Sequence, residues 1–426
     1  MKSSFHARSY KAKTDTNERQ IPISSLKNIK MPVTEIIEQP YPHFIKYMGS
    51  KSKIMDFVLS GVNEIYDDGA LCDLFAGSAS LAGAVRQQVP IHSNDIQAYS
   101  SVLAEAYLES YRYTGLPTAE ILVTAARKIV DCNAEDLGIS IDYRKIASIE
   151  MFNEAERHQQ KLIHSEFGWD WHFFTKTYSG TWWSARQCLW IDALREVAEK
   201  YKGQPSYALI LSSLMYAMAY TSQGTGHYAQ YRDANSESGM NDIAIYRKRE
   251  LETYFIRKYN DAIMPLPENA PVQPHRITSL DFKDCLAQFS GGTVYADPPY
   301  CFVHFSRFYH ALETVVLYDN PVVQQMRGTH VKGRYRETRH QSPFCIKTQV
   351  KQAFLDMFDG IRQSKSSLAL SYSNTGMITI DELSQLAAKV FPKKKIDILL
   401  TDHTHMTLGR RQDRSREVTE CLMLIR

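Results

Sequence analysis

The stretch TVYADPPYCF, at residues 293–302, joins an apolar run to an acid, two prolines and a tyrosine. Proline has no N–H to donate to a neighbouring strand, so a strand that begins here must end at Ala296. The four residues from Asp297 to Tyr300 then form a stiff element just beyond the carboxyl end of that strand. Because open α/β sheets bind ligands at the carboxyl ends of their strands, the sequence predicts a functional site at this turn.

A second strand signal lies upstream, in ALCDLFAGSASLAGAVR at residues 70–86. An apolar run leads through small residues into an alanine-rich helix, and Gly77 in the turn lets the backbone approach a ligand. The next strand pattern, IHSNDI at residues 91–96, closes on Asp95. An acid at roughly this distance, about 20 residues, binds ribose hydroxyls in nucleotide-binding βαβ units. Such a turn can also serve packing alone, and both interpretations stay open here.

The chain has neither a G-x-x-x-x-G-K-[ST] phosphate loop nor a complete G-x-G-x-x-G motif. ATP and NAD are therefore disfavoured as ligands. The pattern favours a ligand that has a ribose but needs no phosphate cradle, and S-adenosylmethionine fits this description.

The order of the patterns predicts an α/β fold whose sheet is mostly parallel. Helical periodicity dominates the middle of the chain, including a basic helix at 244–263, and a proline-rich linker at 265–274 ends it. Strand signals resume at 275–282, and the strands at 395–403 and 418–426 are expected to form a terminal hairpin. We predict a flexible basic arm (1–35), a split catalytic domain (36–112 and 275–426) and a mainly helical insert (113–274).

Composition narrows the class of protein. A net charge of +3 over 426 residues does not by itself imply nucleic acid. The seven cysteines are scattered and form no C-x-x-C pair, which argues for reduced thiols in a cytosolic protein and against a disulfide framework or a structural zinc. The N-terminus has no apolar core of the secretory kind. The apolar run at 207–220 is shorter than the ~20 residues needed to span a bilayer, so it predicts a buried helix and a cytoplasmic protein without membrane attachment.

The chemistry of the 297–300 turn suits an exocyclic amine of a nucleobase. Such an amine is a poor nucleophile because its lone pair is delocalised into the ring. The Asp297 carboxylate and the Pro298 carbonyl can each accept one amino hydrogen, which would localise the lone pair and aim it at a methyl donor. Tyr300 can stack on the base, which reaches such a pocket only when flipped out of the helix. No metal is needed, since the methyl group arrives activated.

Four motifs in order, KYMGSK (46–51), DLFAGSAS (73–80), SNDI (93–96) and DPPY (297–300), resemble those of Dam-type, alpha-class adenine-N6 DNA methyltransferases. The resemblance covers the two flanking α/β segments and implies a Rossmann-like class I S-adenosylmethionine-dependent methyltransferase fold. It also implies that the insert recognises the target sequence. The family often has a second glycine where this chain has Ala79.

The resemblance also assigns roles to individual positions. It implies a catalytic tetrad at Asp297, Pro298, Pro299 and Tyr300, with Lys51 near the target pocket. It implies cofactor contacts at Lys46, Tyr47, Gly49, Lys51, Asp73, Phe75, Gly77, Asp95, Asp281 and Phe282.

Contacts to DNA are expected from two basic loops, at 332–341 and 409–417, although arginine clusters are also common on solvated surfaces. The candidate phosphate contacts are Lys332, Arg334, Arg336, Arg339, Arg410 and Arg411. In the insert, donors and acceptors suited to base edges are Gln223, His227, Gln230, Tyr231 and Arg232. Asn374 ends another strand and is a candidate for the border of the base pocket, whereas Trp182 and Trp183 are interpreted as core. His403 and His405 lack partner ligands, so no metal site is expected.

The sequence therefore predicts a site-specific methyltransferase that moves a methyl group from S-adenosylmethionine to the N6 amine of a flipped adenine in double-stranded DNA. Its expected role is in restriction–modification or other DNA marking, and a cognate restriction endonuclease is left open as a partner. Three alternatives remain: cytosine-N4 methylation, RNA adenine methylation, and a catalytically silent DNA-binding regulator.

Overall fold

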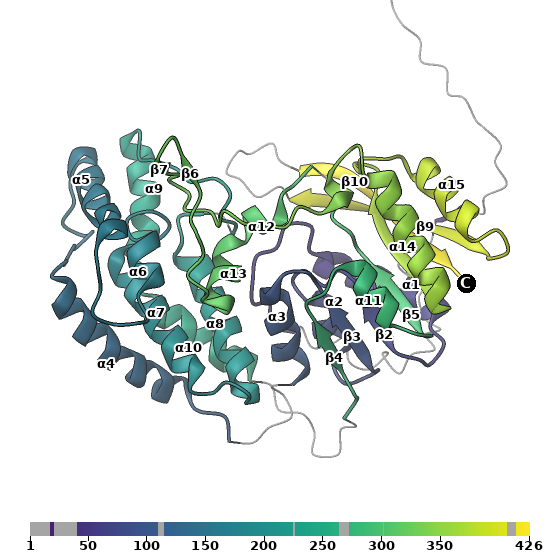
Figure 1. Cartoon of the computed structure of the whole chain (residues 1–426), viewed down its shortest axis with the longest axis horizontal. Helices are drawn as coiled ribbons and strands as arrows, with labels where there is room; N and C mark the ends of the chain where they lie inside the picture. The colour runs from purple at the N-terminus through teal and green to yellow at the C-terminus, as the bar shows by residue number, and fades with distance from the viewer. Residues whose placement is uncertain are drawn as a thin grey trace, which may run out of the picture.

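The computed structural model describes residues 18–20, 41–109, 115–224, 226–263, 272–300, 302–406 and 415–426. Its centre is an eight-stranded sheet of order β1-β9-β10-β8-β5-β2-β3-β4 (Figure 1). Strands β8, β5, β2, β3 and β4 run parallel, and β10 is antiparallel to both of its neighbours. The strands are β1 (Glu18–Gln20), β2 (Leu71–Asp73), β3 (Ile91–Asn94), β4 (Arg276–Thr278), β5 (Thr293–Ala296), β8 (Ser367–Ser373), β9 (Ile396–Met406) and β10 (Ser415–Ile425).

The predicted mixed α/β fold with a mainly parallel sheet is confirmed, as is the terminal hairpin, formed by β9 and β10. One expectation is corrected at the N-terminus. Part of the arm predicted to be flexible forms the short strand β1, which pairs in parallel with β9. Glu18, Arg19 and Gln20 include no apolar residue, so no apolar alternation indicates this strand in the sequence.

Helices cover both faces of the sheet because the strands bury both of their faces. Alternate strand residues contribute to two separate apolar clusters: Leu71 and Tyr295 to one, Cys72 and Val294 to the other. The first cluster includes α1 (Met55–Ile65), α2 (Ser80–Val85) and α3 (Ala98–Leu108). The second includes α11 (Phe282–Gln288), α14 (Val350–Ser364) and α15 (Ile380–Val390).

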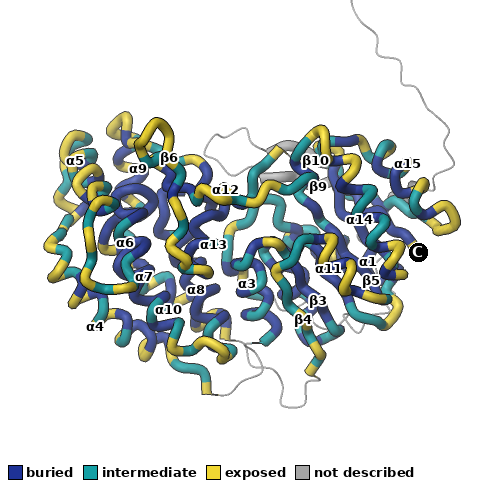
Figure 2. The backbone as a smooth tube through the Cα atoms, viewed as in Figure 1, coloured by how far each residue is buried: buried dark blue, intermediate teal, exposed yellow. Residues whose placement is uncertain are grey.

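A group of helices lies beside the sheet, next to α3 (Figure 1). Its centre is α8, whose apolar run is almost wholly buried, as predicted (Figure 2). Trp182 and Trp183 are fully buried, which confirms their interpretation as core. The helices are α4 (Ala119–Leu137), α5 (Ile149–Gln160), α6 (Phe173–Tyr178), α7 (Ala185–Glu199), α8 (Pro205–Thr221), α9 (Glu237–Arg247) and α10 (Leu251–Ala262), with the 3-10 turn η5 (Lys161–His164).

The single basic helix expected at 244–263 is two helices, because α9 ends at Arg247 and α10 begins at Leu251. The Gln187 side-chain amide donates to the carbonyls of Tyr246 and Arg249, each at 2.8 Å. These bonds satisfy backbone acceptors at the end of α9, so the break costs little. The stabilising partner lies about 60 residues away in the sequence, which is why helical periodicity does not reveal the break.

A second correction concerns residues 305–339, which were expected to belong with the sheet. They form α12 (Phe305–Phe308), α13 (His310–Leu317), β6 (Gln325–Met326) and β7 (Thr329–His330), and lie with the helical group (Figure 1). The Trp182 indole donates to the Gly333 carbonyl at 2.8 Å, and the Arg195 guanidinium donates to the Val315 carbonyl at 2.8 Å. The chain then returns to the sheet through η6 (Pro343–Cys345).

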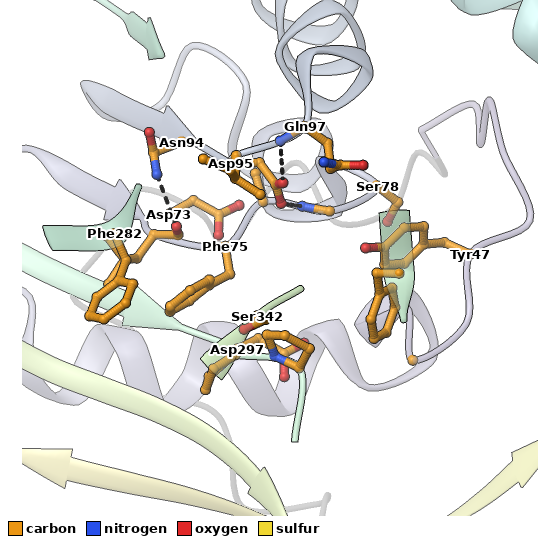
Figure 3. A pocket seen from close by; sticks show the side chains of 18 of the residues that line it. Tyr47, Asp73, Phe75, Ser78, Asn94, Asp95, Gln97, Phe282, Asp297 and Ser342 are labelled. Carbon is orange, nitrogen blue, oxygen red and sulfur yellow. Dashed lines mark hydrogen bonds between the residues drawn. The ribbon is translucent and has the colours of Figure 1, made fainter. Parts of the chain in front are cut away.

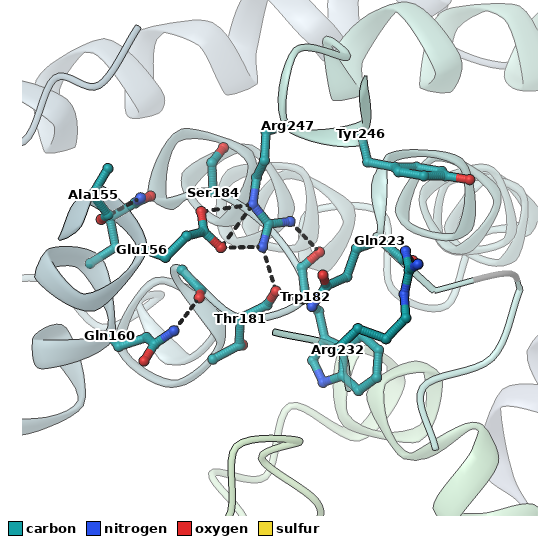
Figure 4. A network of polar contacts seen from close by, with 12 residues as sticks. Ala155, Glu156, Gln160, Thr181, Trp182, Ser184, Gln223, Arg232, Tyr246 and Arg247 are labelled. Carbon is teal, nitrogen blue, oxygen red and sulfur yellow. Dashed lines mark hydrogen bonds and ion pairs between the residues drawn. The ribbon is translucent and has the colours of Figure 1, made fainter. Parts of the chain in front are cut away.

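A buried ion pair joins α5 to α9 (Figure 4). The Arg247 guanidinium lies 2.6 Å from Glu156 and also donates to the backbone carbonyls of Trp182 and Thr181. The Arg247 side chain is fully buried and Glu156 is 7% exposed. Removing one partner of such a pair leaves an uncompensated charge in the interior.

Replacement of Arg247 by methionine is therefore expected to lower the free energy of unfolding by about 3–5 kcal/mol, measured by urea denaturation followed by circular dichroism. The matched control is Arg144→Met, because Arg144 pairs with Glu250 at 3.9 Å on the surface. That exposed pair is expected to contribute less than about 1 kcal/mol. Equal losses in the two variants would contradict this account of the network.

Within the described ranges, no helix combines the length and the apolar character that crossing a membrane requires.

Candidate functional site

The site lies where the order of the strands reverses. From β2 the chain moves to β3 on one side, whereas β5 lies on the other side of β2. Parallel sheets open a crevice at the carboxyl ends of their strands at such a point. A cavity of about 390 Å³ occupies it, lined by residues that follow β2, β3, β4 and β5.

The glycine turn after β2 forms one wall of the cavity (Figure 3). Gly77 has φ +53°, and a side-chain carbon added there would lie 2.9 Å from the Tyr47 ring. The Asp95 carboxylate fixes the turn, because it accepts the Gly77 and Gln97 backbone N–H groups, each at 2.9 Å. Ala79 also has a left-handed φ, +55°. That conformation gives a physical reason for the glycine that the resemblance led us to expect there.

Asp73, at the end of β2, has a buried carboxyl group, and one of its oxygens is unpaired. It is 2% exposed, and its Oδ1 atom has no hydrogen-bond partner among the described residues. Burial, followed by repulsion from Asp297 and Asp95, raises the pKa of Asp73 well above its ordinary value. Burial also raises the pKa of Asp95, against the hydrogen bonds that it accepts from backbone N–H groups. Carboxylates gathered around one cavity favour a cationic occupant.

Aromatic rings form the far wall. The centroids of Phe75 and Phe282 lie 5.9 Å apart, and Phe75 meets Phe344 edge to face at 5.4 Å. Asp281 precedes Phe282 and caps α11 by accepting the Lys283 N–H at 3.0 Å. The structure therefore brings the predicted Asp281 and Phe282 into the same cavity as Phe75.

The segment before α1 covers the opposite side. Tyr47 stacks on Tyr309 with centroids 4.7 Å apart, and the Met48 N–H donates to the Tyr309 hydroxyl at 2.7 Å. Tyr47 and Gly49, two of the predicted cofactor contacts, line the cavity. Lys46 does not line it, because its ammonium lies 4.3 Å above the Tyr220 ring of α8, and its predicted cofactor contact stays a prediction. A neighbour in α8 could not be foreseen from the local motif.

The DPPY turn meets a buried cation at the floor of the cavity. The Lys51 ammonium lies 3.0 Å from the Tyr300 hydroxyl, 3.1 Å from Glu420 and 3.4 Å from Asp297. Lys51 is 5% exposed and Glu420 is 1% exposed, whereas Asp297 is 19% exposed and faces the cavity. Burial lowers the pKa of Lys51, but attraction to Asp297, Tyr300 and Glu420 outweighs it and holds that pKa well above its ordinary value.

Glu420 was missed by the sequence analysis. It lies in β10 within VTECLMLIR (418–426), where it is the one acid in a largely apolar run. That contrast was the available signal, because a buried acid needs a partner. The Tyr300 hydroxyl also donates to Glu420, at 3.2 Å. Glu420 thus holds both the lysine and the tyrosine of the site.

Pro298 and Pro299 of the predicted tetrad line the cavity, and the Pro299 carbonyl accepts a hydrogen bond from the Cys345 thiol. Asn374 is exposed, and its neighbour Thr375 lines the cavity instead. Phe302, two residues after the tetrad, is 86% exposed, and the sequence analysis did not single it out.

Some of the predicted DNA contacts are exposed or half-buried. Gln230 is exposed, Arg232 is 38% exposed and pairs with Asp242, and Lys332 is 63% exposed and pairs with Asp233. Arg339 is half-buried against Gln324. Tyr231 is also half-buried.

Four other predicted contacts are less accessible, and their part in DNA binding stays a prediction. Arg334, Gln223 and His227 are buried, and the Gln223 amide donates to the Thr181 carbonyl at 2.9 Å. Arg336 forms two hydrogen bonds with Asp319. These side chains contact other parts of the protein, and the composition of their loops does not reveal such contacts. Arg410 and Arg411 lie outside the described residues, and so do the side chains of His403 and His405.

Comparison with known proteins points in one direction. The model of the D12 class N6 adenine-specific DNA methyltransferase family matches residues 47–383. The chain is 22% identical over 354 residues to the modification methylase LlaI of Lactococcus lactis subsp. lactis, covering 81% of this chain and 49% of that protein. It is 22% identical over 389 residues to the modification methylase StsI of Streptococcus sanguinis, covering 89% of this chain and 52% of that protein.

A shorter relative is covered almost completely. The chain is 19% identical over 388 residues to the type II methyltransferase M.NlaIII of Neisseria lactamica, covering 88% of this chain and 96% of the relative. The chain thus spans about half the length of the first two relatives and nearly all of the third.

Proposed function

Because the chain belongs to the D12 class of N6 adenine-specific DNA methyltransferases, we propose that it transfers a methyl group from S-adenosylmethionine to the N6 amine of an adenine flipped out of double-stranded DNA. The observation that carries the proposal is a shared cavity. Asp297 and Tyr300 open into the same 390 Å³ space as Asp73 and Asp95, so a methyl donor and an acceptor amine can meet there.

The cavity fits S-adenosylmethionine in charge and shape. This cofactor supplies an electrophilic methyl group on a positively charged sulfur and also carries an ammonium group. The unpaired Asp73 oxygen offers a buried acceptor to positive charge. We propose that Asp95 binds the ribose with its remaining lone pairs, and that Phe75 and Phe282 hold the adenine ring. Tyr47 and Gly49, across the cavity, would border the methionine end.

For the transfer itself, we propose that the Asp297 carboxylate and the Pro298 carbonyl accept the two amino hydrogens of the target base. The amine lone pair is then localised on nitrogen and directed at the methyl group. A nitrogen–carbon bond forms as the sulfur–carbon bond breaks, and one amino proton leaves toward Asp297 or solvent. Tyr300 supports the base from the cavity wall.

We propose that Lys51 and Glu420 act indirectly, by positioning Asp297 and Tyr300. The Lys51 ammonium lies between Asp297, Glu420 and the Tyr300 hydroxyl, so it fixes the positions of the two groups that would touch the base. Glu420 is one of the two anions beside the buried Lys51 ammonium, so it helps to compensate that positive charge. We propose that Lys51 stays protonated and orients Asp297, with Glu420 as its positioning residue.

We propose that the helical group, with the 322–339 segment packed on it, is the target-recognition region that reads the DNA sequence. The accessible candidates are Gln230, Arg232, Lys332 and Arg339. The related modification methylases support a role in restriction–modification, with a cognate endonuclease as the expected partner. We propose on the same ground that the protein acts on DNA in the cytoplasm.

The test is methyl transfer by the purified protein from labelled S-adenosylmethionine to mixed-sequence double-stranded DNA and to RNA, followed by nucleoside analysis. N6-methyladenine in DNA is expected. Label in N4-methylcytosine or in RNA alone would replace the proposed acceptor with one of the alternatives. Absence of label in every nucleic acid, with S-adenosylmethionine bound, would favour the silent regulator.

Cofactor binding is expected to release protons, because Asp73 has a raised pKa in the free protein. A bound cation favours the carboxylate and lowers that pKa, so affinity should rise as pH rises through the free-protein value. Calorimetry in buffers of different ionisation enthalpy measures the release. S-adenosylhomocysteine, which lacks the sulfonium charge, should release fewer protons. The Asp73→Asn variant should bind at least about tenfold more weakly and lose the pH dependence. Proton release unchanged in that variant would contradict this role of Asp73.

A further inference from the structure

Three potential metal ligands meet behind the cofactor cavity, on the α11 face of the sheet. They are Cys72 of β2, His92 of β3 and Cys285 of α11, and all three are buried. The Sγ atoms of Cys72 and Cys285 lie 4.0 Å apart, and Cys285 Sγ lies 3.9 Å from His92 Nε2. The three ligand atoms all lie within 4.8 Å of one another.

The fold itself creates this cluster. Cys72 and His92 are paired across the parallel strands β2 and β3, so their side chains project from the same face. Helix α11 packs on that face and brings Cys285 to them. The lack of C-x-x-C pairs in the sequence argued against a structural zinc. Spacing alone could not reveal ligands that are separated by 20 and 193 positions and that meet only because α11 packs on the sheet.

We propose that Cys72, His92 and Cys285 form a structural binding site for a thiophilic divalent cation, Zn²⁺ in the first instance. Zinc binds thiolate sulfur at about 2.3 Å and imidazole nitrogen at about 2.0–2.1 Å, which separates ligands of a tetrahedral site by roughly 3.5–3.8 Å. The separations of Cys285 Sγ from Cys72 Sγ and from His92 Nε2, 4.0 and 3.9 Å, exceed this range by a few tenths of an ångström, and the third separation is within 4.8 Å. Small rotations of the side chains would close the site.

Charge favours a dication here. Two thiolates and a neutral imidazole bring the net charge of a bound Zn²⁺ to zero, which suits a site without solvent. An oxygen atom would be the fourth ligand of the zinc, as in other sites that have two cysteines and one histidine. Thr278 Oγ1 lies 2.9 Å from His92 Nε2 and donates to Asn94 Oδ1, so it can serve as that ligand or hold a water in its place. On metal binding, His92 must carry its proton on Nδ1.

The site would fasten α11 to β2 and β3. Asp281 and Phe282, at the start of α11, line the cofactor cavity, and so do Asp73 and Asn94, the last residues of the two strands. The cation would therefore hold two walls of the cavity together, yet the binding proposal itself does not depend on the proposed catalytic activity.

The test begins with the full chain purified without a metal-affinity step, in a Cys132→Ser background because Cys132 is an exposed thiol. After incubation with Zn²⁺ and removal of the excess, elemental analysis is expected to find about one zinc per chain. Substitution with Co²⁺ should give thiolate-to-cobalt charge-transfer absorption and the strong visible bands of tetrahedral cobalt. Cys285→Ser and His92→Asn should each lose the stoichiometric metal and weaken these bands.

The matched control is Cys188→Ser, since Cys188 is an equally buried thiol in α7, away from the cluster. It should keep both the metal and the bands. Because a core variant can fail to fold, the parent chain is also melted with Zn²⁺ and with a chelator, and a fall in Tm of at least about 5 °C without metal is expected. Less than about a tenth of an equivalent of metal, no cobalt band and an unchanged Tm would overturn the proposal, as would bands that persist in folded Cys285→Ser.

Discussion

Replacement of Asp297 by alanine is expected to lower kcat for methyl transfer by at least about 10³-fold, because it removes the anion that would accept an amino hydrogen of the target base. Asp297 is the most exposed member of the cluster around Lys51 and faces the cavity. Affinity for S-adenosylmethionine should change by less than about tenfold, because Asp73 and Asp95 remain. Single-turnover kinetics and calorimetry separate the two effects.

Two variants make this result specific. Asp297→Asn keeps one acceptor oxygen but loses the charge, so it should retain more activity than the alanine variant. Asp284→Ala changes an exposed acid of α11, outside the residues that line the cavity, and should leave kcat within about twofold. If Asp297→Ala and Asp284→Ala were equally active, the DPPY turn would not be the catalytic element.

Replacement of Glu420 by glutamine is expected to lower kcat by about 10- to 100-fold, although Glu420 lies behind the groups that would touch the base. Glutamine has nearly the same shape but removes one of two anions beside the buried Lys51. Lys51 should then have a lower pKa, since attraction to Glu420 helps to raise it in the wild type. The alkaline limb of the pH–rate profile should therefore move to lower pH in the variant.

This shift distinguishes positioning from a general loss of stability, which would lower activity without moving the profile. Glu420→Asp keeps the charge and should restore the position of the alkaline limb, even if the shorter side chain lowers the rate. Glu382→Gln, a substitution at an exposed acid of α15, is the matched control. An unchanged profile in Glu420→Gln would show that Glu420 does not act through Lys51.

The parts of the site that sequence could predict are local in the chain. A strand that runs into Asp297 and two prolines has few structural outcomes, and the same holds for the small-residue turn at Gly77 and the acid at Asp95. Each of these motifs lies at the carboxyl end of a strand, and parallel strands bring their carboxyl ends to one edge of the sheet. These few elements were sufficient to predict the sheet and the residues around its crevice.

The parts that could not be predicted depend on partners far away in the sequence. Lys46 was assigned from its motif, but the Tyr220 ring of α8 holds its ammonium outside the cavity. Arg334 looked like surface because its loop is basic, yet it is 7% exposed against the helical group. Neither burial follows from composition or periodicity, because each is decided by packing between elements.

Glu420 and the cluster of Cys72, His92 and Cys285 differ from Lys46 and Arg334, because here the sequence did not point to a role at all. Each residue type suggests chemistry, but the sequence alone does not indicate which distant side chain completes it. Glu420 reaches Lys51 across 369 positions of the chain. A charged residue inside an apolar strand is thus a useful sign of a buried partner, although the partner is known only once the strands are ordered.

The central claim is most directly tested by methylation-sensitive sequencing of DNA from cells that express the protein, beside cells that express Asp297→Ala. The account predicts N6-methyladenine within one short sequence motif in the first culture and its absence in the second. Modified cytosine in place of adenine, or the same pattern of modification in both cultures, would contradict it.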